Sequence, residues 1–384
     1  MPPAYGFILE ATIAKGTVAE IDASAAERCA GVLLVMTHKN APKQGPWGPI
    51  TLENRFARSS PQMADNRVEY YGQPVAFVVA QSFEQARSAA RLIKVIYAAT
   101  PGEYELAPNL SKAEKPADTA FVKTDSIIGD FAPAFAAAPV KFDATFTTPL
   151  HIQAQMEPHA TLAYWKDSRV IIHCSSQLLE NAQKAVANTL QIAPEQVRII
   201  SRYIGGGFGG KLGIYSDVFL SAMASRILKR PVKTALTRQQ VFQLTGHRSD
   251  TIQRLLLHAT SDGKLTAMAH ETWSHCARAD DFYEAASAQT RTLHAAPNRM
   301  TTHRLVKLDV PTSESTRAPG ESVGMLVLEQ AMDELAEKLG LDPMELRLRN
   351  GVQRSRLARP ARALAWLMRA RICAKNWRVN WATT

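Results

Sequence analysis

Cysteine is scarce in this chain, with four residues among 384, far apart and never spaced as C-x-x-C. This scarcity excludes a disulfide scaffold and argues against an iron–sulfur cluster or zinc ribbon held by this chain alone. No apolar run approaches the roughly 18 residues of a membrane span, and the first residues lack a basic segment followed by an apolar one, so we expect no secretory signal. With 46% hydrophobic and 21% charged residues, the composition is that of a folded globular protein.

Acidic residues are missing from the end of the chain, where residues 351–384 hold seven Arg and one Lys and neither Asp nor Glu. That segment accounts for most of the net charge of +10 and holds three of the six tryptophans. One interpretation is a basic, aromatic arm that contacts nucleic acid or an anionic surface. The other is a frameshifted translation of GC-rich DNA, which is rich in Arg and Ala, and we favour it because no amphipathic stripe or RNA-binding signature accompanies the charge.

Strand and helix patterns alternate along residues 1–100 and again after a polar, proline-containing segment. Ser82 and Gln85 form a predicted capping box at the start of a helix. The predicted units are a first domain at 1–100, a linker at 101–124, a second domain at 125–350 and an aberrant basic tail at 351–384. Alternating residues at 251–258 and 264–273 predict antiparallel strands. The fold class is therefore α+β.

The last regular pattern is a helix over residues 323–339, with Leu328, Ala331, Met332 and Leu335 on one face. Gly340 is the expected C-terminal stop of that helix. Asp342 is the expected N-cap of a further short helix, with Pro343 in its first turn. These patterns bear on folding and say nothing about chemistry.

A glycine-rich loop at residues 205–211, GGGFGGK, is the most informative local feature. Glycines at this density suit a backbone that approaches a ligand closely. As a phosphate-binding P-loop it fails, because Leu212 stands where Ser or Thr must hold magnesium. As a dinucleotide fingerprint it is weak, because residues 225–233 lack the acidic residue expected about 20 positions on. The third interpretation is a loop that contacts a pterin cofactor.

Three segments in order resemble the molybdenum hydroxylases, the xanthine dehydrogenase and aldehyde oxidoreductase family. They are the loop IGGGFGGK at 204–211, the segment QMEPHA at 155–160, and TRAPGE at 316–321 with its downstream helix residues. The similarity runs from about residue 5 to residue 350 and is greatest to large subunits of bacterial aldehyde-oxidising enzymes. It implies a partial α/β-hammerhead domain followed by the first molybdopterin-binding domain, with the second molybdopterin-binding domain absent.

The resemblance also implies site residues. Gln177 corresponds to the glutamine beside the molybdenum oxo group, although an exposed amide at a strand end is the plainer interpretation. Arg317 corresponds to an arginine that orients substrate, which suits the fixed guanidinium fork, although a surface ion pair is the alternative. The implied cofactor contacts are Gln177, Gly206, Gly207, Phe208, Gly209 and Arg317, and the implied substrate-pocket residues are Phe208 and Arg317. For Glu157 and His159 we expect a structural role, since Pro158 fixes a turn between them.

The family connection further implies molybdopterin with molybdenum, in the cytosine dinucleotide form, and separate iron–sulfur and FAD subunits as partners. No protein side chain of this chain is expected to ligate the metal. The family's hydroxylation needs a carboxylate base within reach of a molybdenum-bound hydroxyl. That glutamate belongs to the second cofactor domain, so we expect no catalytic residue here and little activity of this chain alone. The expected substrates are aldehydes or N-heterocycles. The expected location of the protein is the cytoplasm, or the periplasm if a partner subunit is exported. The alternative is a non-catalytic relic or a binding protein that uses its basic tail.

Two short motifs resemble those of serine hydrolases and zinc hydrolases, but neither fits its class. Residues 320–324 match GxSxG, but a nucleophile elbow needs a preceding strand and a downstream histidine, and the last histidine is His303. Residues 270–275 resemble the zinc motif HExxH, but one residue too many separates the histidines and the run is strand-like.

Overall fold

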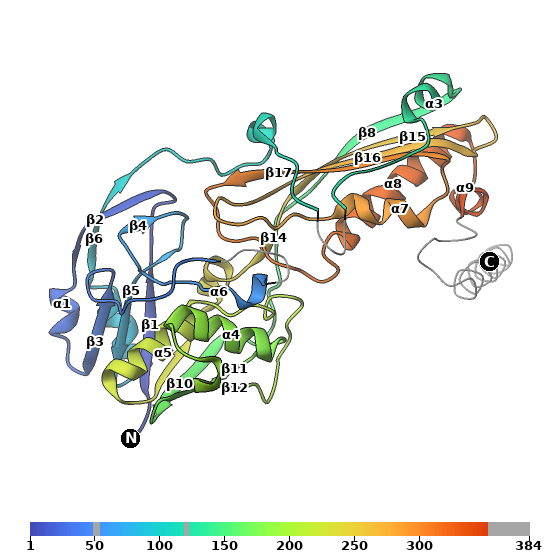
Figure 1. Ribbon diagram of the computed structural model, residues 1–384. Helices are drawn as coiled ribbons and strands as arrows, with labels where there is room; N and C mark the ends of the chain where they lie inside the picture. Colours follow the sequence, from blue (N-terminus) through green and yellow to red (C-terminus); the bar gives the residue numbers. More distant parts are fainter. Residues whose placement is uncertain (49–53, 119–122, 352–384) are drawn as a thin grey trace, which may run out of the picture.

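The computed structural model describes residues 1–48, 54–118 and 123–351, and helices and strands occur throughout these ranges. The mixed α+β class is confirmed. The predicted basic tail lies outside the described residues except for Gly351. The elements gather into two lobes, one built on a seven-stranded sheet and the other on a five-stranded sheet (Figure 1).

The seven-stranded sheet takes strands from both sides of the predicted linker. Its order is β12-β11-β10-β13-β1-β5-β3. The strands are β1 (Ala4–Glu10), β3 (Val32–Thr37), β5 (Pro74–Ala80), β10 (Ala160–Lys166), β11 (Arg169–Cys174), β12 (Val197–Ile200) and β13 (Val232–Ala235). Strand β1 pairs in parallel with β13, so Tyr5 lies opposite Lys233. The first and second predicted domains therefore share one continuous sheet.

A smaller three-stranded sheet, β4-β2-β6, lies beside the first part of the seven-stranded sheet. It consists of β2 (Gly16–Asp22), β4 (Arg67–Val68) and β6 (Lys94–Ala99), with α1 (Ser24–Glu27) and α2 (Phe83–Ala90) nearby. The capping box predicted for α2 is confirmed, because Ser82 Oγ accepts from Gln85 N and Gln85 Oε1 accepts from Ser82 N. Helix α1 is a single turn of four residues.

Helices α4 (Leu179–Leu190) and α5 (Ser216–Leu228) pack on the seven-stranded sheet. Every residue of α5 from Ser216 to Ser225 is buried, because the helix lies between the sheet and surrounding elements. Because buried positions lie all round this helix, its sequence shows no single hydrophobic stripe. Strand β12 ends at Ile200, and the chain continues into the glycine loop before α5.

The second lobe is a five-stranded sheet with the order β7-β17-β16-β15-β8. Its strands are β7 (Ser126–Ile128), β8 (Val140–Thr148), β15 (Thr251–Ala259), β16 (Leu265–Ala277) and β17 (Asn298–Leu308). The predicted antiparallel pairing of β15 with β16 is confirmed. Strand β17, which the sequence patterns did not predict, pairs in parallel with β16.

Helix α8 (Glu321–Leu339) covers this sheet, and α9 (Pro343–Asn350) follows it. The predicted apolar face is confirmed, since Leu328, Ala331, Met332 and Leu335 are fully buried against β15 and β16 residues. Gly340 ends α8 in the left-handed conformation, and the Asp342 carboxylate accepts hydrogen bonds from Met344 N and Glu345 N. Both predicted helix boundaries are therefore correct on the physical grounds given for them.

The shorter elements connect these layers. They are η1 (Arg55–Ala57), η2 (Ala107–Lys112), α3 (Phe131–Ala137), β9 (His151–Ile152), η3 (Pro194–Gln196), α6 (Arg238–Leu244), β14 (His247–Arg248), η4 (Ala286–Ala288) and α7 (Thr290–Leu293). The predicted linker contains η2, and Leu106 beside it is buried with Val306 and Leu308 of β17. That part of the linker is therefore packed onto the second lobe.

Candidate cofactor-binding site

The glycine loop lies between β12 and α5, at one end of the seven-stranded sheet. Glu157 anchors its start, because its Oε2 accepts hydrogen bonds from Gly205 N at 2.7 Å, Ser175 Oγ at 2.8 Å and Lys211 Nζ at 2.6 Å. Burial raises the pKa of Glu157, but these hydrogen bonds outweigh it and the pKa lies below its ordinary value. The ionised carboxylate thus ties both ends of the loop together.

His159 holds the same loop from beneath. Its Nε2 lies 2.9 Å from the Gly210 carbonyl oxygen, and its Nδ1 lies 3.2 Å from Gln155 Nε2. With the proton on Nε2, both contacts are normal hydrogen bonds of a neutral imidazole. Burial is the main cause that lowers the pKa of His159 to about 4. Glu157 and His159 are therefore both engaged with the loop backbone, which agrees with the structural role expected for them.

Gln177 lies directly against the glycines. The side-chain Oε1 of Gln177 accepts a hydrogen bond from Lys211 N at 3.2 Å, and the backbone N–H of Gln177 donates to the Lys211 carbonyl oxygen at 2.7 Å. A Cβ at Gly207 would lie 2.4 Å from Gln177 Oε1, so only glycine lets the loop approach this side chain. The loop thus uses the oxygen of the Gln177 side-chain amide. The side chain is exposed, so its NH2 group can donate to a ligand.

Arg317 reaches the loop through its backbone, although the two segments are 109 residues apart in the sequence. Arg317 N donates to the Phe208 carbonyl at 2.9 Å, and a Cβ on Gly209 would lie 2.1 Å from the Ser315 carbonyl oxygen. Phe208 has φ +52° and Ala318 has φ +54°, a backbone region that side chains other than glycine rarely adopt. Such strain persists where the surroundings hold it, which is typical of functional segments.

The six residues predicted from the family resemblance are thus brought together in one place. Gln177, Phe208 and Arg317 have exposed side chains, and Gly206, Gly207 and Gly209 form the backbone between them. Large apolar side chains nearby in the sequence are also exposed, with Met156 at 89% and Tyr203 at 82%. The residues present fit a molybdopterin, because the exposed Gln177 amide and Arg317 guanidinium offer hydrogen-bond donors to a polar cofactor on either side of the glycine backbone.

The two rejected enzyme motifs are built into ordinary structure. Ser322 lies in the first turn of α8, and its Oγ accepts a hydrogen bond from Arg248. His270 is fully buried within β16 and contacts Thr290 Oγ1 at 2.7 Å and Gln253 Oε1 at 2.9 Å. The sequence arguments against a serine hydrolase and a zinc hydrolase therefore agree with the structure. Within the described ranges, no group of three or more His, Cys, Asp or Glu side chains could hold a metal ion.

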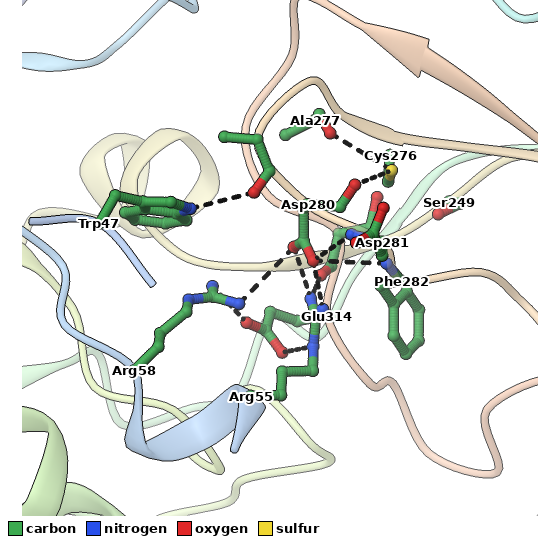
Figure 2. A network of polar contacts seen from close by, with 12 residues as sticks. Trp47, Arg55, Arg58, Ser249, Cys276, Ala277, Asp280, Asp281, Phe282 and Glu314 are labelled. Atoms are coloured by element: carbon green, nitrogen blue, oxygen red, sulfur yellow. Dashed lines mark hydrogen bonds and ion pairs between the residues drawn. The ribbon is translucent and has the colours of Figure 1, made fainter. Parts of the chain in front are cut away.

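A buried charge network that the sequence did not reveal joins the two lobes. Figure 2 shows Arg55 between Asp280 and Glu314, with Arg55 Nη1 at 2.6 Å from Asp280 Oδ1 and Arg55 Nε at 3.2 Å from Glu314 Oε2. Arg58 Nη2 lies 3.1 Å from Glu314 Oε1, and the Arg58 guanidinium lies over the Trp47 ring. We call these four charged residues, Arg55, Arg58, Asp280 and Glu314, the joint network. No local spacing signals it, because each partner lies more than 200 residues from the other.

A cavity of about 680 Å³ lies beside the joint network. Its walls include Arg55, Arg58, Phe56 and Tyr215, and the segment from Gly213 to Ser216 lies directly after the glycine loop. Its lining includes none of Gln177, Phe208 and Arg317. The cavity is therefore a feature of the lobe boundary and separate from the predicted cofactor contacts.

Comparison with known families identifies the class of this chain. Residues 1–101 match the aldehyde oxidase and xanthine dehydrogenase a/b hammerhead domain, and residues 112–351 match the molybdopterin cofactor-binding domain. The chain therefore belongs to the aldehyde oxidase and xanthine dehydrogenase family of molybdopterin-binding proteins. None of the helices in the described part of the chain has the length and apolarity that a membrane span requires.

Particular relatives are similar along most of this chain. The molybdenum-binding subunit PaoC of an Escherichia coli K12 aldehyde oxidoreductase is 42% identical over 350 residues, which cover 91% of this chain and 46% of that subunit. The aldehyde oxidoreductase of Megalodesulfovibrio gigas is 28% identical over 89% of this chain and 39% of its own length. This chain thus spans less than half the length of both relatives.

Solved structures show the same fold. The aldehyde oxidoreductase from Desulfovibrio gigas superposes with a TM-score of 0.80 at 26% identity, over 94% of this chain and 41% of that one. The quinoline 2-oxidoreductase from Pseudomonas putida superposes with a TM-score of 0.83 at 22% identity, over 99% of this chain and 52% of that one. The predicted hammerhead domain followed by the first molybdopterin-binding domain is confirmed.

Proposed function

We propose that this chain is part of the molybdenum-binding subunit of an enzyme that oxidises aldehydes or N-heterocycles with oxygen derived from water. The observation that carries the proposal is the backbone contact between the Phe208 carbonyl and Arg317 N, which unites the glycine loop with the TRAPGE segment. The 42% identity to PaoC favours an aldehyde over a heterocycle as substrate.

Each site residue has a role in this proposal. Molybdopterin, in the cytosine dinucleotide form, supplies a molybdenum centre that accepts electrons from the substrate when it is bound. The glycine backbone at 206, 207 and 209 holds the cofactor at close range. The Gln177 NH2 group would help to hold the cofactor by donating a hydrogen bond to it. Phe208 shapes the substrate pocket, and the Arg317 guanidinium orients the substrate oxygen.

The proposed oxidation requires a carboxylate base. Glu157, the carboxylate that contacts the glycine loop, is not free to act as that base. Glu157 Oε2 already accepts hydrogen bonds from Gly205 and Lys211 of the loop and from Ser175 after β11, and its lowered pKa disfavours proton uptake near neutral pH. That a base glutamate is supplied from outside these residues stays a prediction, as do the iron–sulfur and FAD partner subunits and the low activity of this chain alone.

The test is the cofactor content of the purified protein. We expect molybdenum and pterin to co-purify with the chain in equal amounts, and Gly209→Ala to remove both, because the added methyl group would meet the Ser315 carbonyl. Gly213→Ala is the matched control, since its nearest neighbour would lie 3.8 Å away. Cofactor retained by Gly209→Ala, or absent from a folded wild-type chain expressed with its partners, contradicts the proposal.

A further inference from the structure

The backbone that carries Arg317 is held from beneath by two buried charged residues outside the three family-like segments. They are Arg248 of β14, 4% exposed, and Glu284, fully buried just before η4. Neither has a role in the chemistry described above. The segment that they hold, Thr316 to Gly320, includes the exposed residues Arg317, Ala318 and Pro319.

Arg248 donates to the start of this segment. Its Nη2 lies 2.9 Å from the Thr316 carbonyl oxygen and 2.6 Å from the Arg317 carbonyl oxygen, and its Nη1 donates to Ser322 Oγ. A guanidinium directs several N–H groups in one rigid plane, so one side chain fixes all three acceptors at once. No described carboxylate forms an ion pair with Arg248, so its donors serve the loop.

Glu284 receives the end of the segment. Its Oε2 accepts from Gly320 N at 2.6 Å, and Gly320 has φ +77° with the Ala285 backbone 2.7 Å from where a Cβ would lie. Burial raises the pKa of Glu284 to about 7, although Arg248 and the Gly320 hydrogen bond oppose that change. Only glycine fits this position so close to the Ala285 backbone, and the hydrogen bond from its N–H to Glu284 holds it there.

We propose that Arg248 and Glu284 are positioning residues that hold the Arg317 backbone against the Phe208 carbonyl. Arg248 binds the carbonyl oxygens of Thr316 and Arg317, and Glu284 binds the Gly320 amide. The left-handed Ala318 lies between these two points of contact. The backbone position from which the exposed Arg317 side chain starts is therefore set by two buried residues outside the predicted cofactor contacts. The inference rests on the proposed function only for what Arg317 does, since the contacts themselves are independent of it.

Hydrogen exchange of the Arg317 and Gly320 amides tests the positioning itself in the full chain. Arg248→Lys keeps the charge but loses the planar fork, and we expect exchange at Arg317 to rise about tenfold or more. Glu284→Leu removes the acceptor and should expose the Gly320 amide, whereas Glu284→Gln keeps an oxygen acceptor and should restore protection. Trypsin should cleave the Arg317–Ala318 bond faster in Arg248→Lys and Glu284→Leu only.

Arg254→Lys is the matched control, because this arginine lies on β15 with its side chain 45% exposed and pairs with Asp143 at the surface. We expect no change at Arg317 or Gly320 in that variant. Exchange in β10 and β11 reports whether each variant is folded. If Arg248→Lys does not fold, the contrast between Glu284→Leu and Glu284→Gln decides the question. Unchanged exchange at Arg317 and Gly320 in folded variants overturns the proposal.

Kinetics of the assembled enzyme then separate this proposal from the proposed function. If both are correct, Arg248→Lys lowers kcat/KM in the same direction as Arg317→Lys, with unchanged molybdenum content. If exchange rises but the kinetics of both variants match wild type, the positioning is supported and the role of Arg317 in substrate orientation is contradicted.

Discussion

Lys211 Nζ lies 2.6 Å from Glu157 Oε2, and this pair joins a fully buried ammonium group to a carboxylate whose side chain is 38% exposed. Lys211 is the last residue of the glycine loop, and the Glu157 carboxylate also accepts a hydrogen bond from the amide of Gly205, the first residue. A buried lysine with one anionic partner depends on that partner, because an unpaired buried charge is costly.

Removing the Glu157 charge should therefore destabilise the fold as well as the loop. We expect Glu157→Gln to lower the free energy of unfolding by about 2 kcal/mol, below the roughly 3–5 kcal/mol of a fully buried pair because Glu157 is partly exposed. Urea unfolding at pH 7 measures this value. Glu180→Gln is the control, since Glu180 is 74% exposed in its pair with Lys184 and should cost less than about 0.5 kcal/mol. Equal losses in the two variants would show that the Lys211 ammonium does not need its partner.

Acid should destabilise the protein through its buried histidines. Burial lowers the pKa of His159 to about 4, and the same cause lowers it to about 3 for His247 and His270 and to about 4 for His303. Each binds a proton in the unfolded chain near pH 6.5 but not in the folded one, so stability is complete above that pH and falls as the pH drops toward 4. For His159 alone we expect a loss of about 2 kcal/mol between pH 7.5 and pH 5.

The measurement is urea unfolding of wild type and His159→Gln at pH 7.5 and pH 5. The variant should lose less stability than wild type between the two values, because it has one fewer group to protonate. His151→Gln is the control, since His151 is exposed, and its loss should equal that of wild type. An identical pH dependence in all three proteins would refute the assignment.

Two features of Gly209 should make any other residue unfavourable there: its left-handed backbone conformation and its close approach to Ser315. Gly209 has φ +93°, and any Cβ there would lie 2.1 Å from the Ser315 carbonyl oxygen. We expect Gly209→Ala to lower the free energy of unfolding by about 2 kcal/mol from strain and displacement together. Thermal or urea unfolding of the chain measures it, and Gly213→Ala, with its nearest neighbour 3.8 Å away, should change stability by under about 0.5 kcal/mol. A stable Gly209→Ala protein would mean that the loop can move away from Ser315.

The joint network should contribute strongly to the contact between the lobes. Arg55→Met leaves the buried Asp280 and Glu314 with Arg58 as their remaining cation in the network, so we expect a loss of about 3–5 kcal/mol. Arg67→Met is the control, because its side chain is 66% exposed and its ion pair with Asp65 lies in solvent. Both are measured by urea unfolding. A loss under about 1 kcal/mol for Arg55→Met would show that the lobes do not depend on this network.

Local signals predicted the features that neighbouring residues decide. The Ser82–Gln85 capping box and the N-cap at Asp342 involve groups within three positions, so a few residues of sequence contain the whole interaction. The apolar face of α8 is likewise visible in its period. Strand β17 escaped prediction because polar and charged residues such as Arg299, His303 and Lys307 interrupt its pattern, and these are accommodated by pairing with β16 and by contacts such as that of His303 with Thr124.

The sequence by itself determined helix α8 and its apolar face, two helix caps, the β15–β16 pair, the glycine loop and, through its resemblance to a family, the residues to examine. Only the tertiary structure decided which of them meet: that Arg317 N reaches the Phe208 carbonyl, that Glu157 neutralises Lys211, and that Arg248 lies beneath the Arg317 backbone. The reason is physical. Buried charges and backbone acceptors must find partners wherever the chain brings them, and the selection of partners far apart in sequence depends on the packing of the whole fold.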